Sequence, residues 1–217
     1  MNWKEKLFKN FRLYAVTDIR KYDARILRKV KQAYDGGADI VQFRAKEMPD
    51  AEIYALAEKM RKIADSCRKL FFVNDRLDIA LACGADGIHL GQDDLPVAIA
   101  REVLKKAKAS MWIGKSTHAI DQARQAVREK PDYIGAGPVF KTPTKPGYIP
   151  AGLAYIKQVA KNFSVPFVAI GGIDTTNIET VLKAGATRVA VVRAIFQAED
   201  TYAATQKLRR KLDEFNA

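Results

Sequence analysis

The sequence predicts an α/β fold, a single (β/α)₈ TIM barrel with its active site at the C-terminal ends of the strands. Eight short apolar runs, rich in β-branched residues, recur along the 217 residues, and segments with helical spacing of apolar residues separate them. Strand–helix alternation of this kind implies parallel strands joined by crossover helices. Eight such units in about 200 residues are the number that closes a barrel.

The predicted strands are short and evenly spread. They cover residues 13–18, 39–44, 70–75, 86–91, 111–116, 132–137, 166–172 and 188–193. A faint repeat supports this order, because DGGADIV, ACGADGI and KAGATRV each end a helix at glycine and enter a strand, and EKPDYIG does so with Pro131. The repeat precedes the second, fourth, eighth and sixth strands. A doubly wound open sheet is the alternative, but AVTDIRKY is not the GxGxxG turn expected after its first strand.

Composition favours one domain spanning residues 1–217. The chain is 48% hydrophobic, enough for a sizeable core, and no linker or low-complexity tract divides it. Cys67 and Cys83 stand apart without a CxxC spacing, which indicates a reducing compartment and no structural zinc. The N-terminus lacks the apolar stretch of a signal peptide, and no apolar run is long enough to span a membrane. We therefore expect a cytoplasmic protein without membrane contacts.

The net charge of +12 admits three interpretations: a nucleic-acid binder, a site for polyanionic small molecules, or a solvated Lys/Arg-rich surface. Many cations alternate with apolar residues at helical spacing, as on a solvated helix face. The sequence has no run of five like charges, no zinc-finger spacing and no RNP-type aromatic strand. We therefore do not expect nucleic acid to be a partner.

The stretch VQFRAKE at residues 41–47 carries two cations at the end of an apolar strand. Side chains alternate along a strand, so one face packs under the helices and the other points into the barrel and its mouth. The first face carries Val41, Phe43 and Ala45. The second carries Gln42, Arg44 and Lys46. Unpartnered polar groups there would cost several kcal/mol. They need either acidic neighbours on other strands or an anionic ligand such as phosphate or pyrophosphate.

Acidic residues follow the third and fourth strands. Asn74 and Asp75 end the third strand, and Asp93 and Asp94 follow the fourth. Each aspartate alone fits the N-cap of the next helix equally well. Two carboxylates from adjacent strand ends, facing Arg44 and Lys46, also fit a Mg²⁺-bound pyrophosphate, because Mg²⁺ takes oxygen ligands and the cations take the remaining oxygens.

The fifth strand ends in GKSTH, where Ser116 and Thr117 are candidate N-caps and His118 is one of two histidines. The other, His89, is expected to point inward or to be satisfied in the core. Neither histidine is assigned an acid or base role from the residues alone.

The later loops suggest a second anion site. The loop GAGPVFKTPTKPG offers the hydroxyls of Thr142 and Thr144 and the cation Lys145, or is an ordinary Pro-rich loop. Gly171 and Gly172 follow the seventh strand, where barrels commonly hold a phosphate on backbone N–H groups. Two phosphorylated substrates would suit a mouth with two anion sites.

The sequence resembles the thiamine phosphate synthase (thiamine-phosphate pyrophosphorylase) family, within the group that includes TenI-like proteins. The matching segments are LYAVTD, VQFRAK, VNDRLDIALACGADGIHLGQDDLP, GKSTH, DYIGAGPVFKTPTKPG, GL at 152–153 and VAIGGI. They extend from about residue 13 to residue 196. The resemblance implies a transferase that joins hydroxymethylpyrimidine diphosphate to thiazole phosphate, giving thiamine phosphate and pyrophosphate.

The resemblance also implies roles for individual residues. The pyrimidine diphosphate would be bound by Gln42, Arg44, Lys46, Asn74, Ser116 and Lys145, and Phe43 and Ala45 of the same motif would also bind substrate. Within this set the catalytic residues would be Arg44, Lys46, Ser116 and Lys145. The thiazole phosphate would be bound by Thr142, Pro143, Thr144, Gly172, Val192 and Arg193. Asp75 and Asp94 would bind the cofactor Mg²⁺. No protein nucleophile or strong general base is required, because the aminopyrimidine ring stabilises a benzyl-type cation.

Three positions depart from the family pattern. Ala45 stands where Glu is common, Lys115 where a small apolar residue is usual, and Arg193 where Ser is common. The alternative function is a TenI-like thiazole tautomerase or a paralogue without synthase activity, in which His118 would have a role. We also expect a homodimer, although no residue identifies its interface.

Overall fold

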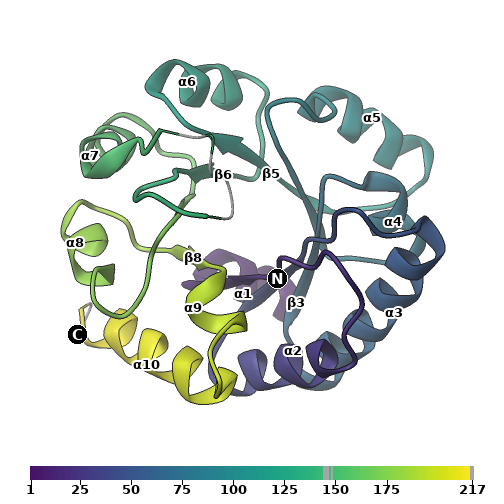
Figure 1. Cartoon of the computed structure of the whole chain (residues 1–217). Coiled ribbons are helices and arrows are strands. Elements are labelled where there is room, and N and C mark those ends of the chain that lie inside the picture. Colours follow the sequence, from purple (N-terminus) through teal and green to yellow (C-terminus); the bar gives the residue numbers. More distant parts are fainter. Residues whose placement is uncertain (144–146, 148, 216–217) are drawn as a thin grey trace.

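Eight parallel strands close into a barrel in the order β1 to β8, and helices surround them (Figure 1). The computed structural model describes residues 1–143, 147 and 149–215. The strands are β1 Leu13–Val16, β2 Ile40–Phe43, β3 Leu70–Asn74, β4 Gly87–Leu90, β5 Trp112–Thr117, β6 Tyr133–Ala136, β7 Phe167–Ile170 and β8 Val189–Val191. Every predicted run contains one of them, and only β5 continues past its predicted end, by one residue. The predicted barrel is confirmed.

The helices connect successive strands on the outside. They are α1 Trp3–Asn10, α2 Arg25–Asp35, α3 Asp50–Cys67, α4 Leu77–Ala82, α5 Val97–Lys106, α6 Ile120–Arg128, α7 Gly152–Asn162, α8 Ile178–Lys183, α9 Arg193–Phe196 and α10 Thr201–Glu214. In the part of the chain that the structure describes, no helix is both long and apolar enough to cross a membrane.

Helix α1 closes the N-terminal end of the barrel and lies behind the strands in Figure 1. It begins with a capping box in which the Asn2 side chain accepts from the Glu5 N–H and the Glu5 carboxylate accepts from the Asn2 N–H. Its Phe8 ring stacks on Trp112 with ring centroids 4.4 Å apart. The helix therefore covers the aromatic layer that fills the barrel interior, where Tyr14, Phe72 and Tyr133 are buried.

The faint glycine repeat marks a recurring helix-to-strand turn. Gly37, Gly84 and Gly185 have φ of 109°, 64° and 102°, in the left-handed region that glycine occupies without strain. Arg68, Lys108 and Lys130 adopt the same region after α3, α5 and α6. The turn is thus more widespread than the sequence repeat, because side-chain-bearing residues also occupy it.

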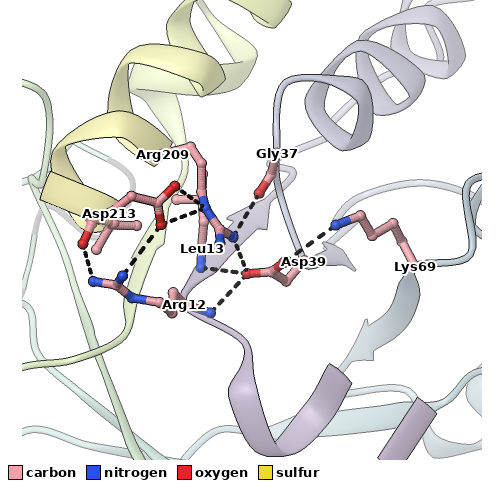
Figure 2. Close-up of polar contacts among 8 residues, drawn as sticks. Arg12, Leu13, Gly37, Asp39, Lys69, Arg209 and Asp213 are labelled. Carbon is pink, nitrogen blue, oxygen red and sulfur yellow. Dashed lines mark hydrogen bonds and ion pairs between the residues drawn. The ribbon is translucent and has the colours of Figure 1, made fainter. Parts of the chain in front are cut away.

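The residue that enters β2, β4 or β6 after this turn is a carboxylate that holds the preceding strand. Asp39, Asp86 and Asp132 accept hydrogen bonds from the backbone N–H of Leu13, Phe71 and Ile113, respectively. The Asp39 carboxylate also accepts from the backbone N–H of Arg12 and pairs with two cations from distant segments, Lys69 and Arg209 (Figure 2). Each such carboxylate joins neighbouring strands at the N-terminal end of the barrel, opposite the predicted site.

Asp86 is the most enclosed member of this set together with its partner Arg61. Their side chains are 4% and 8% exposed and form an ion pair, while Lys4 from α1 approaches the other carboxylate oxygen at 2.6 Å. Removing one member of a buried ion pair leaves the other charge without compensation. The ion pair, together with Lys4, therefore links α1, α3 and the start of β4. A single substitution of Asp86 or Arg61 would break this link.

We expect Asp86→Ala to lower the free energy of unfolding by about 3–5 kcal/mol, because it removes the buried partner of Arg61 and leaves only the exposed Asp65 carboxylate beside that guanidinium. Urea titration followed by circular dichroism measures the change. The control is Asp121→Ala, which breaks the exposed Arg124–Asp121 pair and is expected to cost less than about 1 kcal/mol. Equal losses in the two variants would contradict a special role for the Asp86 cluster.

Candidate active site

A cavity of about 540 Å³ opens at the C-terminal ends of the strands. This volume lies in the range of small-molecule sites, about 300–1,000 Å³. Many of the predicted site residues line it: Gln42, Arg44, Asn74, Ser116, Thr142, Pro143, Gly172, Val192 and Arg193. Residues of both predicted anion sites thus line one cavity, while Lys46, Asp75 and Asp94 are not among its lining residues. Thr144 and Lys145 lie outside the described residues, so their predicted roles stay predictions.

Strand β2 presents Gln42 and Arg44 to the cavity, as the alternation of side chains predicts. The Gln42 amide donates to Tyr14 Oη at 2.8 Å, and Arg44 forms an ion pair with Asp18, both side chains being largely buried. Beyond the strand, Lys46 Nζ lies 3.8 Å from the Asp75 carboxylate. Both cations therefore have acidic neighbours, and Arg44 also lines the cavity, whereas Lys46 is not among its lining residues.

Phe43 and Ala45 do not line the cavity with their side chains. Phe43 is 1% exposed and packs beside Phe71 in the core between the strands and the helices, and Ala45 packs against the same core. The physical reason is the alternation itself, which turns these two residues to the opposite face from Gln42 and Arg44. Their side-chain orientation is thus as predicted, and their predicted contact with substrate, which could come only from the backbone, stays a prediction.

Asp75 and Asp94 face one another across the ends of β3 and β4. The Asp94 carboxylate accepts the Gly91 N–H at 2.6 Å, which holds the loop after β4. Burial first, and then the hydrogen bond and the repulsion from Asp94, raise the pKa of Asp75 to about 6. Lys46 and Arg44 oppose this rise. The pair is a concentration of negative charge that the nearby cations only partly offset.

The capping alternative for these residues is wrong. The helices after β3, β4 and β5 start after Arg76, Pro96 and Ala119, none of which caps with its side chain. Asp75, Asp94 and Ser116 instead point to one another or to the barrel interior. Their side chains therefore do not cap these helices.

The carboxylate pair fits a Mg²⁺ ion that also binds substrate oxygens. Among the described residues, no three His, Cys, Asp or Glu side chains form a group that could hold a metal. Mg²⁺ in phosphate-handling sites commonly uses one or two carboxylates, several waters and substrate phosphate oxygens. Two facing carboxylates, with the pKa of Asp75 raised, are what such a site requires, because a bound cation relieves their repulsion.

Two contributors near this site were not expected. Asp18, the partner of Arg44, is the last residue of the first predicted strand and lies at the same edge of the barrel, so its place in the sequence is a usable signal. Lys115 lies on the outer face of β5, is 5% exposed, and donates from Nζ to the Gly91 carbonyl at 2.7 Å. Lys115, which stands where the family usually has a small apolar residue, therefore supports the same turn that positions Asp94.

The opposite side of the cavity is built from the loops after β6, β7 and β8. Gly171 and Gly172 have φ of 104° and 66°, and a Cβ at Gly171 would lie 2.4 Å from the Cβ of Pro138. Glycine thus permits the two loops to pack, with Phe140 N–H donating to the Gly171 carbonyl at 3.0 Å. The exposed Arg193 donates from Nε to Gln197 Oε1 at 2.8 Å. This contact holds the guanidinium at the cavity rim.

The two histidines both line the cavity. His89 points inward, as expected, and lies between Tyr133 and Ser116. His118 Nδ1 donates to the Gly137 carbonyl, and its own backbone N–H donates to Gln122 Oε1 at 2.7 Å. His118 is therefore held by backbone and helix α6 on the side of the cavity formed by β5 and β6.

Fold and cavity together define a TIM-barrel protein that binds its ligands at the C-terminal ends of the strands. The family model described as thiamine monophosphate synthase matches residues 13–195. A thiamine-phosphate synthase from Pyrococcus horikoshii is 41% identical over 99% of both chains. The chain belongs to the thiamine monophosphate synthase family.

Further relatives agree with this assignment. A thiamine-phosphate synthase from a Nostoc species is 45% identical over 97% of this chain, which spans 58% of that relative's length. The solved structure of a thiamine phosphate pyrophosphorylase from Pyrococcus furiosus superposes with a TM-score of 0.86 at 35% identity, covering 97% of this chain and 100% of that one.

We expect Asp75→Asn to stabilise the protein by about 1–2 kcal/mol at pH 8 in EDTA. A raised carboxyl pKa means that the ionised form is less favourable in the folded chain, so removing the charge removes this cost above pH 6. Asn also tolerates the φ of 61° at this position. Excess Mg²⁺ should then stabilise the unsubstituted protein and not the variant.

Urea titration with EDTA and with Mg²⁺ measures both effects. The matched control is Asp93→Asn, which changes the exposed neighbour of Asp94 and should leave both the stability and the response to Mg²⁺ unaltered. Destabilisation by Asp75→Asn, or an equal response to Mg²⁺ in all three proteins, would contradict the carboxylate pair as a cation site.

Proposed function

We propose that this protein joins 4-amino-2-methyl-5-hydroxymethylpyrimidine diphosphate to 4-methyl-5-(2-hydroxyethyl)thiazole phosphate, releasing pyrophosphate and forming thiamine phosphate. One observation supports this above all. One cavity is lined by Arg44, which lies near the Asp75–Asp94 carboxylate pair, on the side of β2 to β4, and by a glycine-containing loop and Arg193 on the side of β7 and β8. Two phosphorylated substrates need two separate anion-binding regions of this kind. Family membership supports the same reaction and does not favour the tautomerase alternative.

The proposed chemistry begins with departure of pyrophosphate. As the C–O bond to the pyrimidine methylene breaks, the amino-substituted ring stabilises the positive charge on carbon, and negative charge grows on the leaving oxygen. Arg44 and Lys46 lie where they neutralise this charge, and Lys145 is proposed to do so from the loop after β6. Fixed cations contribute most when they are oriented before the reaction. The ion pair with Asp18 holds Arg44 in this way.

Asp75 and Asp94 are the residues that would hold Mg²⁺. The ion would supply positive charge to the diphosphate oxygens that the side chains do not reach. The carboxylates themselves place that charge beside Arg44 and Lys46, so cation and diphosphate occupy one end of the cavity.

The second substrate is proposed to bind with its phosphate at Gly172, Val192 and Arg193 and with Thr142, Pro143 and Thr144 beside it. Its ring nitrogen then attacks the pyrimidine methylene carbon, forming the C–N bond. The proposed role of the protein in this step is positioning, which in favourable cases supplies a large part of the acceleration. Ser116 lies on the cavity floor between the two ends.

We also propose a cytoplasmic location and a homodimer. The unpaired Cys67 and Cys83 support the reducing compartment. No feature of the described residues identifies a dimer interface, so the oligomeric state stays a prediction.

We expect the purified protein to form thiamine phosphate from the two substrates with Mg²⁺ and not with EDTA. Oxidation of the product to fluorescent thiochrome measures it. Arg44→Lys should lower kcat/KM for the pyrimidine diphosphate about 10- to 100-fold, because lysine keeps the charge and loses the bidentate geometry.

The matched control is Arg25→Lys, which alters an exposed arginine paired with Asp23 and should leave kcat/KM within about twofold. An equal loss in both variants would mean that the assay reports general damage. Absence of product from the folded protein, together with conversion of the thiazole tautomer, would replace the proposed synthase by the tautomerase.

We expect Arg193→Ala to raise KM for the thiazole phosphate about tenfold, because it removes a charge-assisted contact to a phosphate. KM for the pyrimidine diphosphate should stay unchanged. Initial rates with each substrate varied in turn measure the two constants. Arg210→Ala is the control, since Arg210 is also paired with a glutamine of its helix, Gln206. A rise in KM for the pyrimidine diphosphate alone would mean that Arg193 binds that substrate, and it would contradict the proposed contact with the thiazole phosphate.

A further inference from the structure

A chain of hydrogen bonds crosses the floor of the cavity. Gln42 Nε2 lies 2.8 Å from Tyr14 Oη, and Tyr14 Oη lies 3.0 Å from Tyr133 Oη. Tyr133 Oη lies 2.9 Å from His89 Nδ1, and His89 Nε2 lies 2.9 Å from Ser116 Oγ. The five side chains come from five different strands. The chain connects Gln42 on one side of the cavity with Ser116 on the other.

The barrel makes room for this chain with two glycines. A Cβ at Gly114 would lie 2.2 Å from Cζ of Tyr133, and a Cβ at Gly135 would lie 3.1 Å from Cε1 of His89. Tyr133 could not keep its position with any other residue at 114. These glycines lie inside strands β5 and β6, where glycine is unfavourable in itself. Their place is explained by the two rings that they accommodate.

Proton counting gives the chain a direction. An amide nitrogen only donates, so Tyr14 Oη accepts from Gln42 and its own proton goes to Tyr133 Oη. Tyr133 then donates to His89 Nδ1, which must be unprotonated. The ring proton of the neutral imidazole is left on Nε2 and is donated to Ser116 Oγ. Burial raises the pKa of both tyrosines, so both keep the protons that this count requires.

We propose that Tyr133 is a positioning residue that acts through His89 to present the Ser116 hydroxyl as a hydrogen-bond donor to the pyrimidine diphosphate. Because Ser116 Oγ accepts from His89, its own proton is directed away from the imidazole and toward an acceptor atom in the cavity. In the opposite direction, Ser116 Oγ would donate its proton to His89 Nε2, and the substrate would then face only the acceptor lone pairs of Ser116 Oγ. The direction therefore decides which substrate atoms Ser116 recognises.

The histidine tautomer reports the direction, and ¹⁵N chemical shifts of the His89 ring measure it without substrate or activity. We expect the Nε2–H tautomer in the unsubstituted protein at pH 8. Gln42→Glu introduces a carboxylate that only accepts, so it should reverse the chain and move the ring proton to Nδ1. An Nδ1–H ring in the unsubstituted protein, or unchanged shifts in Gln42→Glu, would overturn the relay.

Kinetics test the link to Ser116, and this half of the inference rests on the proposed synthase function. Tyr133→Phe should lower kcat about tenfold, the factor expected for one lost hydrogen bond, and leave KM for the thiazole phosphate unchanged. In a Ser116→Ala background, Tyr133→Phe should have no further effect. Additive losses would overturn the action of Tyr133 through Ser116.

The matched control is Tyr155→Phe, which removes a buried phenol hydroxyl bonded to Thr117 Oγ1 at 2.6 Å, outside the relay. It should leave the His89 shifts and the kinetics unchanged, and a change equal to that of Tyr133→Phe would overturn the proposal. An Nε2–H ring that reverses in Gln42→Glu, in a protein that makes no thiamine phosphate, would support the relay and refute only the proposed function.

Discussion

Barrel closure with strict alternation of side chains is the constraint on which the rest of this structure depends. Each strand has residues facing the interior and residues facing the helices, and closure brings the interior residues of eight strands to one axis. Aromatic rings fill the interior below the mouth. At the mouth the same inward positions carry Gln42, Asn74 and Ser116. The cavity is therefore lined by the inward-facing residues at the C-terminal ends of the strands.

Carboxylates have opposite electrostatic surroundings at the two ends of the barrel. At the N-terminal end, Asp39 and Asp86 accept backbone N–H groups and are surrounded by cations, so their charge is compensated and stabilises the fold (Figure 2). At the C-terminal end, Asp75 and Asp94 face one another, and the pKa of Asp75 is raised. The first arrangement is complete within the chain. The second is improved by an added cation, which is the property expected of a binding site.

The sequence predicted the barrel, all eight strands and the face of Gln42 and Arg44, because these depend on local periodicity. It assigned caps to Asp75 and Ser116 as an alternative, and the structure rejects this because the local pattern of a cap does not show where the side chain points. It also placed Phe43 and Ala45 on the face that packs under the helices, where they lie, because the same alternation governs them. The contacts of Tyr133 with Tyr14 and His89 needed the register across the barrel, which no local pattern contains.

The division between a charged mouth and an uncharged floor also explains how one cavity can accommodate a diphosphate and an aromatic ring. A charge on the floor would be costly, because the surrounding side chains are buried and apolar. Gln42, Tyr14, Tyr133, His89 and Ser116 satisfy one another as neutral groups there, while Arg44 and Lys46 meet their acidic partners near the rim. A pyrimidine ring on the floor would thus contact neutral, directed hydrogen-bond groups, and its diphosphate would extend toward the cations. The floor would orient the ring, and the rim would stabilise the charge that develops when the diphosphate leaves.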